Sequence, residues 1–160
     1  MRMELMSKTS LALLEHAFDQ MLVVAEVLGE PRIHQRPLGP ATNAVGALIV
    51  HCCEVTEFWL GPVALRRPSD RDREAEFSAV ESLDDLHRRV ATCVSTASRD
   101  LEWIAAGLGG GVNGAREFLP GTDRPDSAVV LYVGKELFQH LGHIELAADA
   151  LRQSLDPTPP

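Results

Sequence analysis

Apolar side chains recur every three or four residues in four long stretches of the chain. In the first stretch this spacing places the apolar side chains on one face of an α-helix. Gly29 and Pro31 follow it, and neither residue favours helix continuation. The pattern therefore predicts a helix that ends near residue 28, with the core positions Leu11, Leu14, Phe18, Met21, Ala25 and Leu28.

The second and third stretches predict two more helices. The second helix has Thr42 or Asn43 as its cap and ends at the Gly-Pro pair 61–62. The third helix has Ser82 as its cap and ends at the glycine-rich stretch 107–111. Between them lies a segment, 66–76, that is dense in both signs of charge and is followed by Phe77. We expect this segment to cross from one helix to the next with Phe77 as its apolar anchor.

The fourth stretch predicts a helix capped by Asp126 or Ser127 that runs to about Gln153. Four long amphipathic helices without a convincing strand predict an all-α fold, a four-helix bundle. We expect one domain over residues 1–155 and a disordered, proline-rich tail at 156–160. Two of the connections are long, one of them before the fourth helix, and their lengths permit a crossover topology instead of a simple up-down bundle. The polar segments 29–41, 61–81 and 107–126 are long enough to line a pocket.

Composition and charge narrow the class of protein. With 160 residues and 45% hydrophobic content, the chain fits one compact domain. The formal net charge of −8 and the lack of a basic stripe argue against a nucleic-acid partner. No apolar run approaches the roughly 20 residues that cross a bilayer, and the N-terminus does not resemble a signal peptide. We therefore expect a cytoplasmic protein without a membrane partner.

Three polar side chains are placed on or beside apolar helix faces. Glu136 and His140 are one helical turn apart in the fourth helix, and His51 is central to the apolar face of the second. A buried carboxylate needs a cationic or strongly hydrogen-bonding partner. Two imidazoles and one carboxylate typically leave a coordination position open on zinc or another divalent transition metal. On spacing alone, a hydrogen-bonded core histidine and a surface Glu-His pair explain the pattern equally well.

Other residues are candidates for supporting roles. His143 shares the face of His140 and could replace Glu136 as a ligand, although its place on the helix favours pocket lining. Glu54 could orient an imidazole or a substrate, but such a residue is more often a surface partner of arginine. Arg71 and Arg73 belong to the charged segment, which is most simply a solvated crossing. An arginine there could also bind a substrate carboxylate through both of its nitrogens.

Three motifs resemble the DinB superfamily of metal-binding four-helix bundles, particularly the branch with the N-terminal domain of mycothiol-dependent maleylpyruvate isomerase. They are the stretch from Gly46 to His51 with the Glu-Phe-Trp at 57–59, the segment 71–77, and Glu-Leu-Phe-Gln-His-Leu-Gly-His at 136–143. The resemblance implies that His51, Glu136 and His140 are the three metal ligands. The metal in this family is usually zinc, with nickel or another divalent ion as alternatives, and relatives often form homodimers.

The resemblance also implies a function. Several members use a low-molecular-weight thiol such as mycothiol, and a thiol bound at an open metal position loses its proton more readily. We therefore expect a metal-dependent enzyme that transfers such a thiol to a small electrophilic substrate, or isomerises that substrate, in detoxification. The chain ends after the fourth helix without the isomerase's C-terminal domain, which puts isomerisation in question. The alternative is a non-enzymatic bundle that binds a metal or small ligand for sensing or storage.

Overall fold

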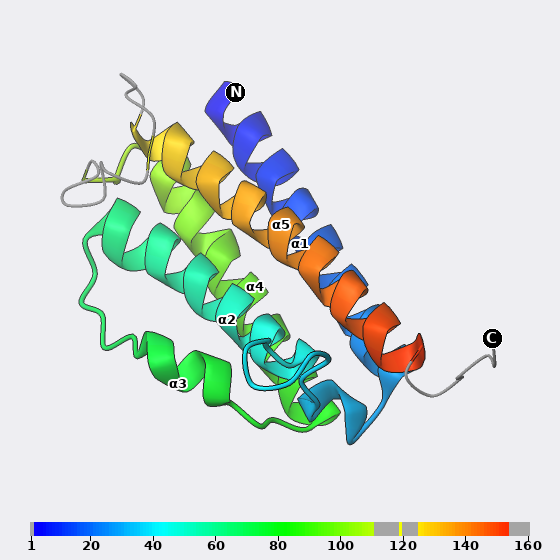
Figure 1. Cartoon of the computed structure of the whole chain (residues 1–160). Coiled ribbons are helices and arrows are strands. Elements are labelled where there is room, and N and C mark those ends of the chain that lie inside the picture. Colours follow the sequence, from blue (N-terminus) through cyan, green and yellow to red (C-terminus); the bar gives the residue numbers. More distant parts are fainter. Residues whose placement is uncertain (1, 111–118, 120–124, 154–160) are drawn as a thin grey trace.

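The computed structural model describes residues 2–110, 119 and 125–153, and over these residues the chain is helical without strands (Figure 1). Four long helices form the bundle: α1 (Arg2–Leu28), α2 (Val45–Phe58), α4 (Leu83–Ala105) and α5 (Pro125–Gln153). The predicted all-α bundle is confirmed. The tail at 156–160 lies outside the described residues.

The helices are connected by a crossover topology. Helix α1 packs against α4 and α5, and α2 packs against the same two helices. Consecutive helices α1 and α2 therefore lie on a diagonal of the bundle, and Figure 1 shows α2 and α4 running in one direction and α1 and α5 in the other. The long connection between α2 and α4 returns the chain along the outside of the bundle. The crossover that the loop lengths permitted is the one observed.

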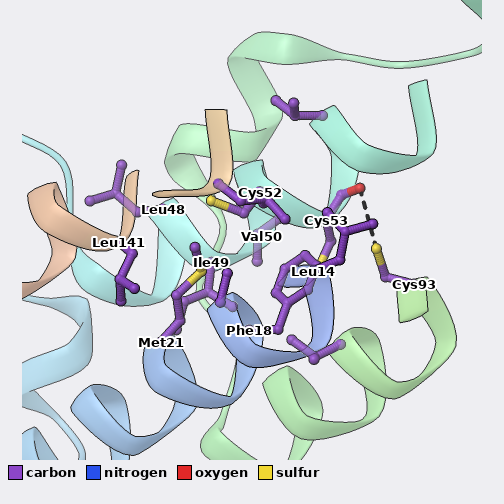
Figure 2. Packing of buried hydrophobic residues seen from close by; sticks show 14 of the residues in the cluster. Leu14, Phe18, Met21, Leu48, Ile49, Val50, Cys52, Cys53, Cys93 and Leu141 are labelled. Carbon is purple, nitrogen blue, oxygen red and sulfur yellow. Dashed lines mark hydrogen bonds between the residues drawn. The ribbon is translucent and has the colours of Figure 1, made fainter. Parts of the chain in front are cut away.

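The core is formed by the predicted apolar faces and includes all three cysteines. Figure 2 shows Cys52, Cys53 and Cys93 packed among the apolar side chains of α1, α2 and α5. Cys93 Sγ lies 3.6 Å from the carbonyl oxygen of Cys53, as a donor to it, and no cysteine is in a disulfide. Burial raises the pKa of Cys53 well above its ordinary value. The three cysteines are free, buried core residues, as expected.

The predicted helix ends are partly correct. Ser82 caps α4 by accepting a hydrogen bond from the Asp85 amide at 3.2 Å. The cap of α2 is Ala44, which makes no side-chain bond, because the Thr42 hydroxyl instead bonds within the preceding loop. Helix α5 already begins at Pro125, so Asp126 lies inside its first turn. The caps proposed at 42–43 and 126–127 are therefore wrong.

Helix α2 does not end at the Gly-Pro pair 61–62. It continues as a π-helical turn, η2 (Trp59–Ala64), with Pro62 inside it. Proline has no N–H to donate to the carbonyl of Phe58, so the regular hydrogen-bond pattern cannot continue and the turn widens. The combined stretch Val45–Ala64 is 20 residues long and apolar enough to cross a membrane, contrary to the sequence-based expectation, but 78% of its most apolar window is buried inside the bundle. Such a buried stretch is typical of a core helix of a folded domain.

Two short helices interrupt connections that the sequence predicts as irregular. A 3-10 turn, η1 (Arg32–His34), follows α1, and helix α3 (Arg73–Ser78) lies in the charged segment and packs against α2. The carboxylate of Asp72 caps α3 by accepting hydrogen bonds from the amides of Glu74 and Ala75. This cap fixes the start of α3 and turns Glu76 towards the bundle.

Candidate functional site

The structure brings the two predicted histidine ligands together between α2 and α5. His51 is 4% exposed, and its ring centroid lies 4.8 Å from that of His140, with the two rings at 78°. On α5, His140 Nε2 lies 3.8 Å from Glu136 Oε2. The two imidazoles are therefore in edge-to-face contact, and the carboxylate is next to the second imidazole.

Helix packing explains this placement. Leu137 and Leu141 on α5 are buried in the core, and Glu136 and His140 lie beside them at the edge of the same face. His51 is on the buried face of α2, which packs against α5. The apolar residues thus dock the helices, and the polar residues meet at the rim of the contact.

Electrostatics keep both imidazoles in the neutral form. Burial lowers the pKa of His51, and the hydrogen bond and charge of Glu76 offset this only in part. Burial also lowers the pKa of His140, and the neighbouring His51 adds to the effect. A neutral imidazole retains a lone pair on one ring nitrogen, which is the form that binds a metal.

The carboxylate of Glu136 has partners of its own. Lys135 Nζ donates to Glu136 Oε1 at 2.6 Å, and the Tyr132 hydroxyl also hydrogen-bonds this carboxylate. Burial would raise the pKa of Glu136, but Lys135 and Tyr132 outweigh it and hold that pKa below its ordinary value. Glu136 is therefore an ionised carboxylate that is already neutralised by a lysine.

The nitrogen and oxygen atoms of His51, His140 and Glu136 are donors of the kind that a divalent transition metal binds. Their present arrangement does not direct all three at one position. Within residues 2–110, 119 and 125–153, no group of three His, Cys, Asp or Glu side chains is arranged to hold an ion. However, His140 Nδ1 is buried and has no hydrogen-bond partner among the described residues. Such an atom is costly to bury, so this nitrogen is available to a ligand. Two imidazoles and a carboxylate form a donor set that zinc accepts.

Glu76 is a site residue that the sequence analysis did not identify. It is 4% exposed, and its Oε2 lies 2.6 Å from His51 Nδ1. Arg71 donates to the same carboxylate with Nε at 2.5 Å and Nη2 at 3.0 Å. Burial would raise the pKa of Glu76, but the hydrogen bonds from Arg71 and His51 hold it below its ordinary value. Glu76 is therefore a buried, ionised carboxylate.

The other predicted supporting residues lie at different distances from the histidines. Arg71 contacts Glu76 and not the histidines. Arg73 is exposed at the start of α3, the helix that contains Glu76. His143 is exposed, with its ring stacked 6.3 Å from that of His140. Glu54 accepts a hydrogen bond from Arg89 at 3.1 Å, which is the surface pairing considered as its simpler role.

A polar pocket borders the site on the side of Arg71 and Glu76. Its wall combines residues of α2, α3 and α4 with the connection before α3, including Glu54, Asp70, Arg71, Glu76, Glu81 and Arg89. A neighbouring polar hollow shares Glu54, Asp70 and Arg71 and extends to Arg67 and Thr96. Carboxylates and guanidinium groups alternate here, so the pocket offers hydrogen-bond donors and acceptors together. A separate, mostly apolar pocket near Leu101 and Ile104 contains none of the site residues.

Sequence comparison identifies the family. Residues 9–157 match the mycothiol-S-transferase family, which is a DinB-like family, so the resemblance seen in the motifs is confirmed. No curated protein and no solved structure matches the chain. Since the match covers nearly the whole chain and the helices have the expected all-α architecture, the chain belongs to the mycothiol-S-transferase family.

Proposed function

We propose that the protein is a divalent-metal-dependent transferase that adds the thiol of mycothiol to a small electrophile. The observation that carries this proposal is the contact between the buried imidazole of His51 and the half-buried imidazole of His140, whose Nδ1 is buried without a partner among the described residues. His51, Glu136 and His140 would hold the ion, with zinc as the preferred metal and nickel as an alternative. The family supports a thiol substrate.

The side chains of the site suit this chemistry. A bound divalent metal supplies Lewis acidity that makes a thiol more acidic. The lowered pKa values of His51 and His140 keep their lone pairs available at neutral pH. Glu136 is ionised, and Lys135 beside it is positioned to release the carboxylate by rotating into solvent. In the reaction, the thiolate sulfur forms a bond to the electrophilic carbon, and the leaving group departs with its bonding electrons.

The polar pocket suits the rest of the thiol. Mycothiol carries a sugar-rich group whose hydroxyls need both donors and acceptors. The pocket supplies arginine donors and carboxylate acceptors next to Glu76, which contacts His51. We place the sugar-rich group in this pocket, and we place the protein in the cytoplasm, where its three free cysteines would remain reduced.

One observation favours the rival, a bundle that binds a ligand without catalysis or has only a polar core. The hydrogen bond from His51 to Glu76 and the ion pair from Lys135 to Glu136 satisfy much of the polar surface without a metal. This account leaves the buried His140 Nδ1 unexplained. The metal-dependent reading accounts for that atom and for the family match together.

Initial rates of mycothiol conjugation to an activated aryl halide distinguish the two functions. We expect the zinc-loaded wild type to react, and the chelator-treated protein and His140→Ala to lose at least about 100-fold in rate, as loss of a metal ligand does. His87→Ala is the matched control, because His87 forms an exposed pair with Glu26 on another face of the bundle. Equal rates with and without metal, or an unchanged rate in His140→Ala, would rule out the proposed mechanism.

A further inference from the structure

We propose that Glu76, held by Arg71, is a positioning residue that fixes the tautomer and ring orientation of His51 and leaves Nε2 as its lone-pair nitrogen. The role of the free Nε2 as a metal ligand rests on the proposed function. The contacts among Arg71, Glu76 and His51 are observed without a metal.

The hydrogen bond decides which nitrogen carries the proton. Glu76 Oε2 lies 2.6 Å from His51 Nδ1, and an ionised carboxylate can only accept. Nδ1 must therefore carry the proton, and in a neutral ring Nε2 is then unprotonated. Carboxylate partners of this kind orient metal-binding histidines and increase their basicity.

Arg71 explains why His51 does not need a second proton. A buried carboxylate next to histidine would normally stabilise the imidazolium form by its charge. Arg71 binds Glu76 through two nitrogens at 2.5 and 3.0 Å and supplies the compensating positive charge. Its guanidinium also lies 5.1 Å from the ring centroid of Phe58, which ties it to α2. The negative charge of Glu76 is thus compensated by Arg71 and not by a protonated His51.

The ring of His51 is also fixed by its faces and edges. Phe77, next to Glu76 in α3, lies against the imidazole with ring centroids 4.6 Å apart and planes at 30°. His140 meets the same imidazole edge to face. Helix α3 therefore provides both a hydrogen bond at one ring nitrogen and a surface for the ring plane. These contacts with His51 explain why α3, a helix of six residues, carries the buried carboxylate of Glu76.

Two readouts test the inference, and the first needs no metal. Nitrogen-15 NMR of the imidazoles in the metal-free protein reports which nitrogen of His51 is protonated. We expect Nδ1–H in the wild type, the same tautomer largely retained in Glu76→Gln because its amide oxygen can still accept, and a mixture of tautomers in Glu76→Ala. The exposed Glu74→Ala in the same helix is the control and should match the wild type.

Zinc affinity, measured by competition with a chelator, is the second readout. We expect Glu76→Ala to weaken zinc binding by about 10- to 100-fold, Glu76→Gln to weaken it less, and Glu74→Ala to leave it unchanged. Circular dichroism confirms that each variant is folded, and Glu76→Gln provides the test if Glu76→Ala is not. An Nε2–H tautomer in the wild type, or unchanged tautomer and affinity in Glu76→Ala, would overturn the inference. If the wild type binds no zinc, the proposed function fails, whereas the NMR result still decides the role of Glu76.

Discussion

At the scale of single residues, burial controls the protonation of the two histidines. His51 and His140 both have pKa values below the ordinary value of about 6.5 because the bundle removes them from water. The unfolded chain would take up protons near pH 6.5, whereas the native protein takes them up only at lower pH. The unfolded state therefore binds more protons as the pH falls through this window, and the native state loses stability.

The free energy of unfolding of the metal-free protein should consequently fall as the pH is lowered from 7.5 to 5.5. Each histidine contributes a slope of at most about 1.4 kcal/mol per pH unit. The window stays above the pKa values of Glu76 and Glu136, which are lowered, so these carboxylates do not contribute. Urea denaturation at a series of pH values measures the slope, which should be shallower in His140→Ala and unchanged in His87→Ala. Stability that is constant or increases down to pH 5.5 would contradict the assignment.

At the scale of elements, the π-helical turn η2 is closed by an arginine that crosses over a glycine. The side chain of Arg67 forms an ion pair with Asp100 of α4, which is 1% exposed. A Cβ atom on Gly61 would overlap the guanidinium of Arg67, so the arginine can cross here in this position only over a glycine. Burial raises the pKa of Asp100, and Arg67 offsets this only in part. The glycine, the arginine and the aspartate therefore act as one unit.

A double-mutant cycle tests this unit. Arg67→Ala should cost about 2 kcal/mol, because it leaves a buried carboxylate without its partner. Gly61→Ala should cost about 1 to 2 kcal/mol in the wild type by displacing Arg67, but should be neutral or slightly stabilising in the Arg67→Ala background, where alanine favours the helix. Denaturant titrations measure each value, with the exposed Arg88→Ala expected to cost less than about 0.5 kcal/mol. Additive effects of the two substitutions would contradict the crossing.

The sequence predicted the long helices because their signal is local. A repeat of apolar residues every three or four positions specifies a buried helical face wherever that face is packed. The turn η2 was missed because a Gly-Pro pair normally ends a helix. The pairing of Arg67, just beyond this turn, with the distant Asp100 has no signal in the local pattern. Helix α3 was missed because a segment with both charges has the composition of a solvated crossing.

The two histidines of the candidate site could be predicted from the sequence, whereas Glu76 could not. His51 and His140 lie on helix faces that the periodicity defines, so their approach followed from the bundle itself. Glu76 could not be distinguished from the other acidic residues of its segment, since only its contacts with Arg71 and His51 mark it. The signal that could have found it is Phe77, an apolar anchor that places its neighbour near the core.

At the scale of the whole molecule, the crossover topology assembles the site from three separate parts of the chain. Helix α2 supplies His51, the connection around α3 supplies Arg71 and Glu76, and α5 supplies Glu136 and His140. Because α2 packs against α5 while α1 packs against α4, the polar residues of α2 and α5 can meet at one rim of the bundle. The bundle thus supports a site on two long helices, with the short helix α3 holding one of its histidines.

Anomalous diffraction at the zinc absorption edge, from crystals of the full chain grown with zinc, shows whether His51, Glu136 and His140 bind one metal ion. We expect one strong peak about 2.0–2.2 Å from a ring nitrogen of His51, a ring nitrogen of His140 and a carboxylate oxygen of Glu136. We also expect that Glu136 has turned away from Lys135 and that Glu76 still binds His51 Nδ1. The absence of a peak at these side chains in zinc-saturated crystals, or a peak that is not bound by His51, would show that the three residues do not form this metal site.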